Sequence, residues 1–117
     1  MKSYDPEGKR PLVMFSSNGL TKHFLYETYN NAWTLIYTSW ILESKNIYHH
    51  DSEPARVNYF ESGKIEEECY YRNGSLHRDG KPAVIKYTED GEDFYKAYYK
   101  NGKMYRCIMH GEDKEIH

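Results

Sequence analysis

The sequence predicts an all-β protein, a twisted antiparallel meander of about eight strands, and three observations lead to this fold. A pattern at Pro54–Arg78 recurs at Pro82–Arg106, with 28 positions between equivalent residues. The chain holds 13 Tyr beside 2 Trp and 4 Phe, and aromatic residues favour strands. Asn-Gly pairs recur between alternating segments, which is a strong hairpin signal. Together these observations indicate a sheet built from repeated hairpins.

A first hairpin is expected near the amino terminus, after a polar arm at residues 1–10. The apolar segment PLVMF at 11–15 meets SSNG at 16–19, and LTKHFLYETY at 20–29 is the expected return strand. Asn30 and Asn31 follow, and Asn tolerates the left-handed conformations that a further turn needs. These segments are therefore predicted to be a non-repeat hairpin.

The segment AWTLIYTSWILE at 32–43 is nearly free of charge and allows two interpretations. With a period of two, both faces are largely apolar, which fits a strand covered on both sides. A buried helix would instead gather a stripe of apolar side chains. The aromatic and β-branched content favours the strand, and the helix stays as the alternative. The helical stripe would consist of Trp33, Ile36, Tyr37, Trp40 and Ile41.

The repeat begins before Pro54. SKNIYHHDSEPA at 44–55 lies 28 positions ahead of RNGSLHRDGKPA at 72–83, so His49 matches His77 and Asp51 matches Asp79. This is a third, partial copy of the unit. Extended further back with the same spacing, the pattern places residues 40–42 over residues 68–70, which supports a strand in a degenerate first unit.

Within each unit, two strands alternate around a glycine turn. Ala55, Val57 and Tyr59, and their equivalents Ala83, Ile85 and Tyr87, are expected to face a core. Gly63 and Gly91 supply the turns. Each unit opens on a proline, which suits the first residue of a strand. Cys69 and Tyr71, like Ala97 and Tyr99, share one face of the return strand, and Tyr70 and Tyr98 lie on the other.

We expect one domain over residues 1–117, with an amino-terminal hairpin and Trp-rich strand at 1–44, hairpin repeats at 45–106 and a carboxyl-terminal cap at 107–117. No segment is apolar enough to suggest a membrane span, and the start of the chain shows no targeting signal. We therefore expect a cytoplasmic location, with Cys69 and Cys107 as free thiols. The second face of a single-layer sheet must be covered either by residues 1–44 or by a partner.

The two-copy pattern also resembles a known type of repeat. YYRNGSLHRDGKPAVIKY and YYKNGKMYR are similar to the tandem Tyr-Tyr-x-Asn-Gly-x-Leu-His-Arg-x-Asp-Gly-Pro-Ala repeats of bacteriophage and giant-virus proteins, which are related to MORN-type hairpin repeats. The resemblance covers residues 45–106 and implies a meander of hairpins and a viral or phage origin, with the host cytoplasm as location. The final unit, YRCIMHGED at 105–113, departs from the motif as a cap would.

The charge pattern argues against several functions. A net charge of −2 without a basic stripe speaks against direct nucleic-acid binding. His49, His50 and Asp51 are adjacent on an extended chain and do not converge as metal ligands, and His110, Glu112 and His117 match no ligand spacing. No catalytic motif occurs, so we expect neither an enzyme nor a cofactor. The recurring His and Asp residues are interpreted as turn construction.

What remains is a surface for binding. Acidic and aromatic residues cluster around the two equivalent turns, and an acidic surface of this kind would engage a basic site on a protein partner, for which a nucleic-acid-binding host protein is the candidate. The predicted function is therefore a non-enzymatic protein-binding module, as a phage or viral inhibitor of a host defence protein. The alternatives are a structural or self-assembling repeat protein, which includes a homo-oligomer, and a small enzyme or ligand binder that uses His49, His50 or His77. The predicted partner surface consists of Glu66, Glu67, Glu68, Tyr70, Glu92, Asp93, Phe94, Tyr95 and Tyr98.

Overall fold

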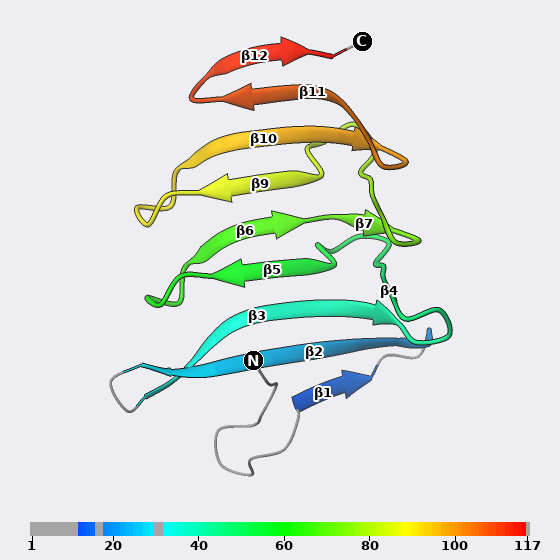
Figure 1. Cartoon of the computed structure of the whole chain (residues 1–117), viewed down its shortest axis with the longest axis vertical. Coiled ribbons are helices and arrows are strands. Elements are labelled where there is room, and N and C mark those ends of the chain that lie inside the picture. The colour runs from blue at the N-terminus through cyan, green and yellow to red at the C-terminus, as the bar shows by residue number, and fades with distance from the viewer. Residues whose placement is uncertain (1–11, 16–17, 30–31, 117) are drawn as a thin grey trace.

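The computed structural model describes residues 12–15, 18–29 and 32–116 and shows an all-β chain built on one long antiparallel sheet (Figure 1). The main path of the sheet runs β1-β2-β3-β5-β6-β9-β10-β11-β12, which confirms the predicted meander. The molecule measures 49 × 36 × 19 Å, so it is a slab. Its strands are β1 (Leu12–Phe15), β2 (Leu20–Tyr29), β3 (Ala32–Leu42), β4 (Ile47–Tyr48), β5 (Arg56–Tyr59), β6 (Ile65–Cys69), β7 (Tyr71–Arg72), β8 (Ser75–Leu76), β9 (Val84–Tyr87), β10 (Asp93–Lys100), β11 (Lys103–Met109) and β12 (Glu112–Glu115).

The predicted amino-terminal hairpin is confirmed where the structure describes it. β1 pairs with β2 from Leu12 opposite Phe24 to Phe15 opposite Thr21, and Gly19 in the turn has a φ of 73°. Several predicted features lie outside the described residues: the arm at 1–10, the first residue of the segment 11–15, the turn residues 16–17, the turn at 30–31 and His117. β1 to β3 extend the main sheet, so the described part of residues 1–44 does not cover a face of it.

Residues 32–42 form a strand, and the helical alternative is wrong. β3 pairs with β2 along its length and with β5 and β4 on its other edge. The prediction that both faces are covered is wrong for the first half of the strand, because Trp33 is 41% exposed. Only Thr38, Ser39 and Trp40 are buried. The strand becomes buried where β5, the first strand of the repeat units, pairs with it.

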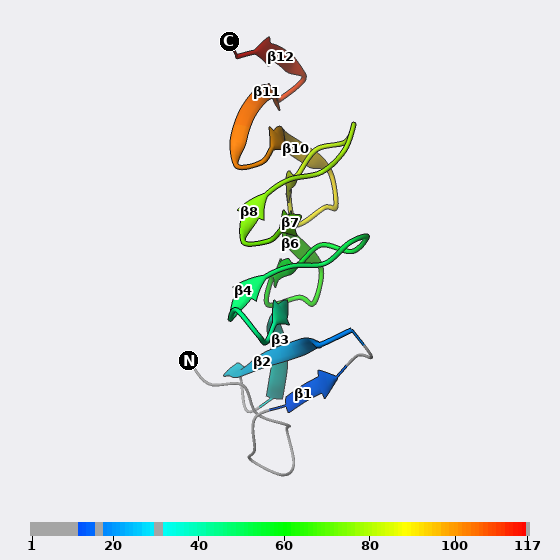
Figure 2. The same cartoon turned by 90° about the vertical axis from the view of Figure 1, so that its right-hand side faces the viewer.

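Each repeat unit is a long hairpin whose end folds away from the main sheet. β6 leads into β7, and β7 pairs with β8 across a two-residue turn at Asn73 and Gly74, with φ of 49° and 83°. Asn101 and Gly102 repeat this geometry with φ of 49° and 84° between β10 and β11. Positive φ at both central residues fits the hairpin turn that Asn-Gly favours. Figure 2 shows β4 and β8 displaced to one side of the stacked strands.

A histidine joins each unit to the next. The Nδ1 atom of His49 accepts a hydrogen bond from the backbone N–H of Asn73 at 2.9 Å, and His77 accepts one from Asn101 at the same distance. The Nε2 atoms lie 3.2 Å from Asp51 and 3.0 Å from Asp79, respectively. Because Asn is the first of the two central residues of each turn, its N–H lies outside the hydrogen-bond ladder of the hairpin and would otherwise lack a protein partner there. The recurring His and Asp residues therefore hold successive hairpin turns together.

The predicted extension of the 28-residue spacing back to residues 40–42 needs a correction. Trp40 donates its backbone N–H to Ala55 and accepts from His49, just as Tyr70 donates to Ala83 and accepts from His77. Trp40 therefore occupies the place of Tyr70, 30 positions away, and the predicted spacing of 28 fails before residue 43. The cause is the turn at residues 43–46, which has four residues between β3 and β4 where the later units have two.

The core also differs from the prediction. Ala55, Val57 and Ala83 are buried as expected, but Tyr59, Ile85 and Tyr87 are only partly buried. In β9, Val84 is buried instead of Ile85. Val84 pairs with Cys69 and Ala97, and alternation places all three on the face opposite Ile85. The hairpin end β7–β8 folds over this face and covers it. The cluster is completed by Tyr71, Leu76, Tyr95, Tyr99 and Met104.

The last unit ends the repeat with a different arrangement. β11 continues beyond Met104 and pairs with β12, from Arg106 opposite Glu115 to Met109 opposite Glu112. β12 has the sequence EDKE and is exposed throughout. Charged side chains on an edge strand discourage pairing with another chain. Arg106 and Asp113 form an ion pair across the two strands.

Candidate partner-binding edge

The predicted acidic residues lie along one long edge of the sheet, which we call the turn edge. It comprises the turns at residues 60–64 and 88–92 and the strand residues 65–66 and 93–94 next to them. The two turns are equivalent: Phe60 donates its N–H to Lys64 and Gly63 to Phe60, as Thr88 donates to Glu92 and Gly91 to Thr88. Figure 1 shows these turns one above the other, at the opposite end of the strands from the ends of β3, β7 and β10.

Carboxylates dominate the turn edge and are not neutralised there. Lys64 is the only cation in its two segments. Asp93 pairs with Lys96 at 3.6 Å, but the other carboxylates form no ion pair within the described part of the chain. All are exposed to solvent. A surface of this kind produces a negative potential that attracts cationic groups. The carboxylates without an ion pair are Glu61, Glu66, Glu89, Asp90 and Glu92.

The three consecutive glutamates of β6 do not act as one acidic run, because they differ in exposure and in their partners. Glu67 is only 20% exposed in its side chain and lies 3.4 Å from Arg56 and 3.8 Å from Lys86. Glu68 accepts a hydrogen bond from the hydroxyl of Tyr87. Glu66 alone is exposed. Of the predicted run, therefore, only Glu66 is available to a partner.

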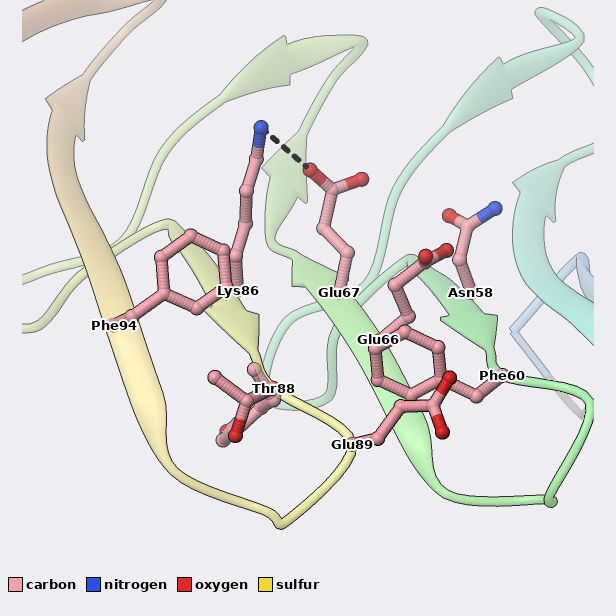
Figure 3. A pocket seen from close by; sticks show the side chains of 9 residues that line it. Asn58, Phe60, Glu66, Glu67, Lys86, Thr88, Glu89 and Phe94 are labelled. Atoms are coloured by element: carbon pink, nitrogen blue, oxygen red, sulfur yellow. Dashed lines mark ion pairs between the residues drawn. The ribbon is translucent and has the colours of Figure 1, made fainter.

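A hollow of about 500 Å³ opens between the two turns (Figure 3). This volume lies within the usual range for ligand sites. The rings of Phe60 and Phe94 lie in its wall, and carboxylates stand around them. Asn58 also lines the hollow, and its side-chain oxygen is buried and has no hydrogen-bond partner among the described residues. The remaining lining residues are Glu66, Glu67, Lys86, Tyr87, Thr88 and Glu89.

Phe94 is held in place from the side of the last hairpin. Its ring stacks on His110, with 5.6 Å between the ring centres and 22° between the planes. The backbone N–H of His110 donates to the carbonyl of Phe94 at 2.8 Å. The aromatic wall of the hollow is therefore supported by the turn between β11 and β12.

The predicted tyrosines lie away from this hollow. The guanidinium of Arg78 lies over the ring of Tyr70, 3.8 Å from the ring centre. That of Arg106 lies over the ring of Tyr98 at 5.0 Å. These contacts place both rings towards the opposite edge of the sheet. Tyr95 packs on the Cys69 cluster, and burial raises the pKa of its hydroxyl to about 12. The structure thus brings together Glu66, Glu67 and Phe94, with Glu92 and Asp93 on the adjoining turn.

Sequence reasoning did not assign Asn58, Lys86, Tyr87 or Thr88 to the site. A signal for several of them exists in the repeat itself, because the hollow forms where the two copies differ. Phe60 stands where the next copy has Thr88, and Phe94 stands where the previous copy has Glu66. Asn58 likewise corresponds to Lys86. Positions that break a repeat cannot be explained by the construction of its hairpins.

The opposite edge of the sheet, which we call the loop edge, has a different electrostatic character. It comprises the hairpin turns at 43–46, 73–74 and 101–102 and the connecting loops at 49–55 and 77–83. Its carboxylates all have partners among the described residues. Glu43 contacts Thr21 and His23, and Asp79 contacts Arg72 and His77. The other two pairs are His49 with Asp51 and His50 with Glu53.

The histidines of the loop edge are engaged by the backbone. His50 accepts at Nδ1 from the N–H groups of Ser52 and Glu53, at 3.1 and 2.8 Å, and His49 and His77 accept from the hairpin turns. Within residues 12–15, 18–29 and 32–116, no three His, Cys, Asp or Glu side chains are grouped so that they could hold a metal ion. These contacts indicate that the histidines hold the loops to the hairpin turns.

Comparison with protein-family models, curated proteins and solved structures finds no significant match to this chain. The described residues contain no helix long and apolar enough to cross a membrane. What the protein does must therefore be argued from its own surfaces.

Proposed function

We propose that the protein is a non-enzymatic binding module that uses its turn edge to engage a basic site on a protein partner. One observation carries this proposal: the turn edge holds five exposed carboxylates that form no ion pair among the described residues, and two of them, Glu66 and Glu89, line a hollow walled by two phenylalanines. Aromatic rings framed by charge are typical of interface centres, where an apolar anchor is surrounded by a polar rim. Opposite charge on the partner would steer the encounter.

The other surfaces support this choice of edge. On the loop edge, the carboxylates are already paired with histidine or arginine of the same chain. Tyr70 and Tyr98 are covered by Arg78 and Arg106. A partner at those places would have to displace internal contacts before making new ones, whereas the turn edge offers free acceptors.

The more specific form of the proposal is an inhibitor from a phage or virus that blocks a host defence protein. Its support is the resemblance of residues 45–106 to phage and giant-virus repeats, together with the acidic edge. A basic groove that normally holds nucleic acid is the partner site that such an edge would fit, because carboxylates can replace phosphates as its counter-charges.

The test is affinity capture from a bacterial lysate with three versions of the immobilised protein. The wild type is compared with Glu89→Lys/Glu92→Lys on the turn edge and Lys100→Glu/Lys103→Glu on the loop edge. We expect the turn-edge variant to lose at least about tenfold of the captured partner, while the loop-edge variant keeps it. Capture by the wild type should weaken as salt rises. Capture that all three versions retain equally would contradict the proposal.

Self-assembly is the second candidate, and one observation favours it. A hollow of about 720 Å³ at the loop edge is lined by three cationic residues, Arg78, Lys100 and Lys103, beside the single carboxylate of Asp79, so one copy's acidic edge complements another's mainly basic hollow. Such a head-to-tail contact would form open chains. Light scattering decides between the candidates: self-assembly predicts a mass that rises with concentration and that either charge-reversal variant lowers.

A further inference from the structure

The hollow on the turn edge has the features of a site for one particular cation. Its lining contains the carboxylates of Glu66, Glu67 and Glu89 against the single ammonium of Lys86. Phe60 and Phe94 supply aromatic faces, which attract cations. An occupant that brings both positive charge and a flat surface would match both the carboxylates and the rings.

We infer that this hollow receives an arginine side chain of the protein partner. This rests on the proposed function, because a protein presents the arginine. A guanidinium is flat and stacks on aromatic rings, and its donors point in several fixed directions. It can therefore lie against Phe94 or Phe60 and pair with Glu66 or Glu89. A lysine ammonium is strongly hydrated and does not stack as a plane, so it makes fewer of these contacts.

The ammonium group of Lys86 competes with an incoming cation for this acidic site. Its Nζ lies 3.8 Å from a carboxylate oxygen of Glu67 and 5.2 Å from the ring centre of Tyr95 (Figure 3 shows the ion pair). Glu67 is also held by Arg56 at 3.4 Å, so it stays paired if Lys86 moves. Removal of the Lys86 charge should therefore open the site to an incoming cation. This direction of effect is not expected of a residue that merely supports the fold.

The repeat provides a matched control. Glu61 and Glu89 are equivalent residues of the two turns, and both are exposed, but only Glu89 lines the hollow. A general attraction of cations to the turn edge would treat them alike. A built site would distinguish them.

The test is a titration of the whole ¹⁵N-labelled protein, followed by NMR, with N-acetyl-arginine-N-methylamide. The lysine and citrulline counterparts are the comparison compounds, since citrulline keeps the shape of arginine without its charge. We expect saturable shifts at the amides of Phe60, Glu66, Glu89 and Phe94 with a Kd of about 1–10 mM. The lysine compound should bind at least about threefold more weakly, and the citrulline compound should not saturate.

Variants sharpen the test. Glu89→Gln and Phe94→Ala should each weaken the arginine compound about three- to tenfold, and Glu61→Gln should leave it unchanged. Lys86→Met should strengthen it about threefold. Dispersed, wild-type-like spectra of each variant show that the chain is folded. Equal affinity for arginine and lysine, or equal effects of Glu61→Gln and Glu89→Gln, would overturn the inference.

The two proposals fail separately. If the arginine compound binds as described but no protein is captured through the turn edge, the site stands and the proposed function is wrong. If a protein is captured through the turn edge while arginine and lysine compounds bind alike, the proposed function stands and the arginine site is wrong.

Discussion

The two long edges of this sheet use similar residues for different purposes. On the loop edge, His49, His77, Asp51 and Asp79 recur at the repeat spacing and contact one another or the next hairpin turn. On the turn edge, Phe60 and Phe94 break the repeat, and five exposed carboxylates of this edge make no ion pair within the described chain. Residues that recur build the stack of hairpins, and residues that depart from the repeat are free for a partner. Substitutions should therefore affect stability on one edge and binding on the other.

The largest effect on stability is expected from His77→Ala. His77 is 6% exposed, accepts the N–H of Asn101 and contacts Asp79, so its removal leaves a backbone donor without a partner. A loss of about 2–3 kcal/mol in the free energy of unfolding is expected. Urea denaturation measures it.

Two further variants serve as controls for this comparison. His49→Ala removes the equivalent bond at a more exposed joint and should cost about 1 kcal/mol. Glu92→Ala on the turn edge should change stability by less than about 0.5 kcal/mol. If His77→Ala unfolds at the same urea concentration as the wild type, the histidines do not stabilise the contacts between hairpins. That result would favour the alternative of a functional histidine site.

Much of this architecture follows from short-range signals in the sequence. The Asn-Gly pairs at 73–74 and 101–102 fix two-residue turns, because both central residues must adopt positive φ. Gly63 and Gly91 mark the other turns for a similar reason. The spacing of 28 residues places one hairpin directly after the next along the chain, and neighbouring hairpins that pair in this order form an antiparallel meander.

Other features depend on packing that no local pattern contains. The buried face of β9 is decided by the hairpin end β7–β8, which folds onto Cys69 and makes Val84 rather than Ile85 the core residue. The shift of Trp40 into the place of Tyr70 depends on two additional residues in the turn at 43–46. The hollow needs side chains from neighbouring units, and only the register between β6 and β9 brings Glu67 beside Lys86. Sequence alone therefore indicated Glu66, Glu67 and Phe94 but not Asn58, Lys86, Tyr87 or Thr88.

A smaller effect is expected from acid on the loop edge. The hydrogen bond from Arg72, followed by that from His77, holds the pKa of Asp79 below its ordinary value of 3.8. A lowered carboxyl pKa stabilises the fold above the ordinary value, and this contribution is lost as the pH falls through the lowered pKa. The wild type should therefore be more stable than Asp79→Asn at pH 6, and the difference should shrink below about pH 4. Urea denaturation at several pH values measures this.

The turn edge provides the contrast for that experiment. Five of its six carboxylates have no cationic partner among the described residues, so acid should not remove stabilising pairs at these five. Asp90→Asn should follow the wild type over the same pH range. A difference between wild type and Asp79→Asn that stays constant down to pH 2 would show that the Arg72 and His77 contacts do not stabilise the charged form.

The smallest effect has the opposite sign. Glu89 stands among like charges on the turn edge, and Glu89→Gln removes part of their mutual repulsion. We expect the free energy of unfolding to rise slightly, by no more than about 0.5 kcal/mol, at low salt. The gain should vanish at about 0.5 M NaCl, where exposed charges are screened. If Glu89→Gln weakens arginine binding and also stabilises the fold, then Glu89 serves binding and not stability. Destabilisation by Glu89→Gln would instead mean that the turn-edge carboxylates, like those of the loop edge, support the structure.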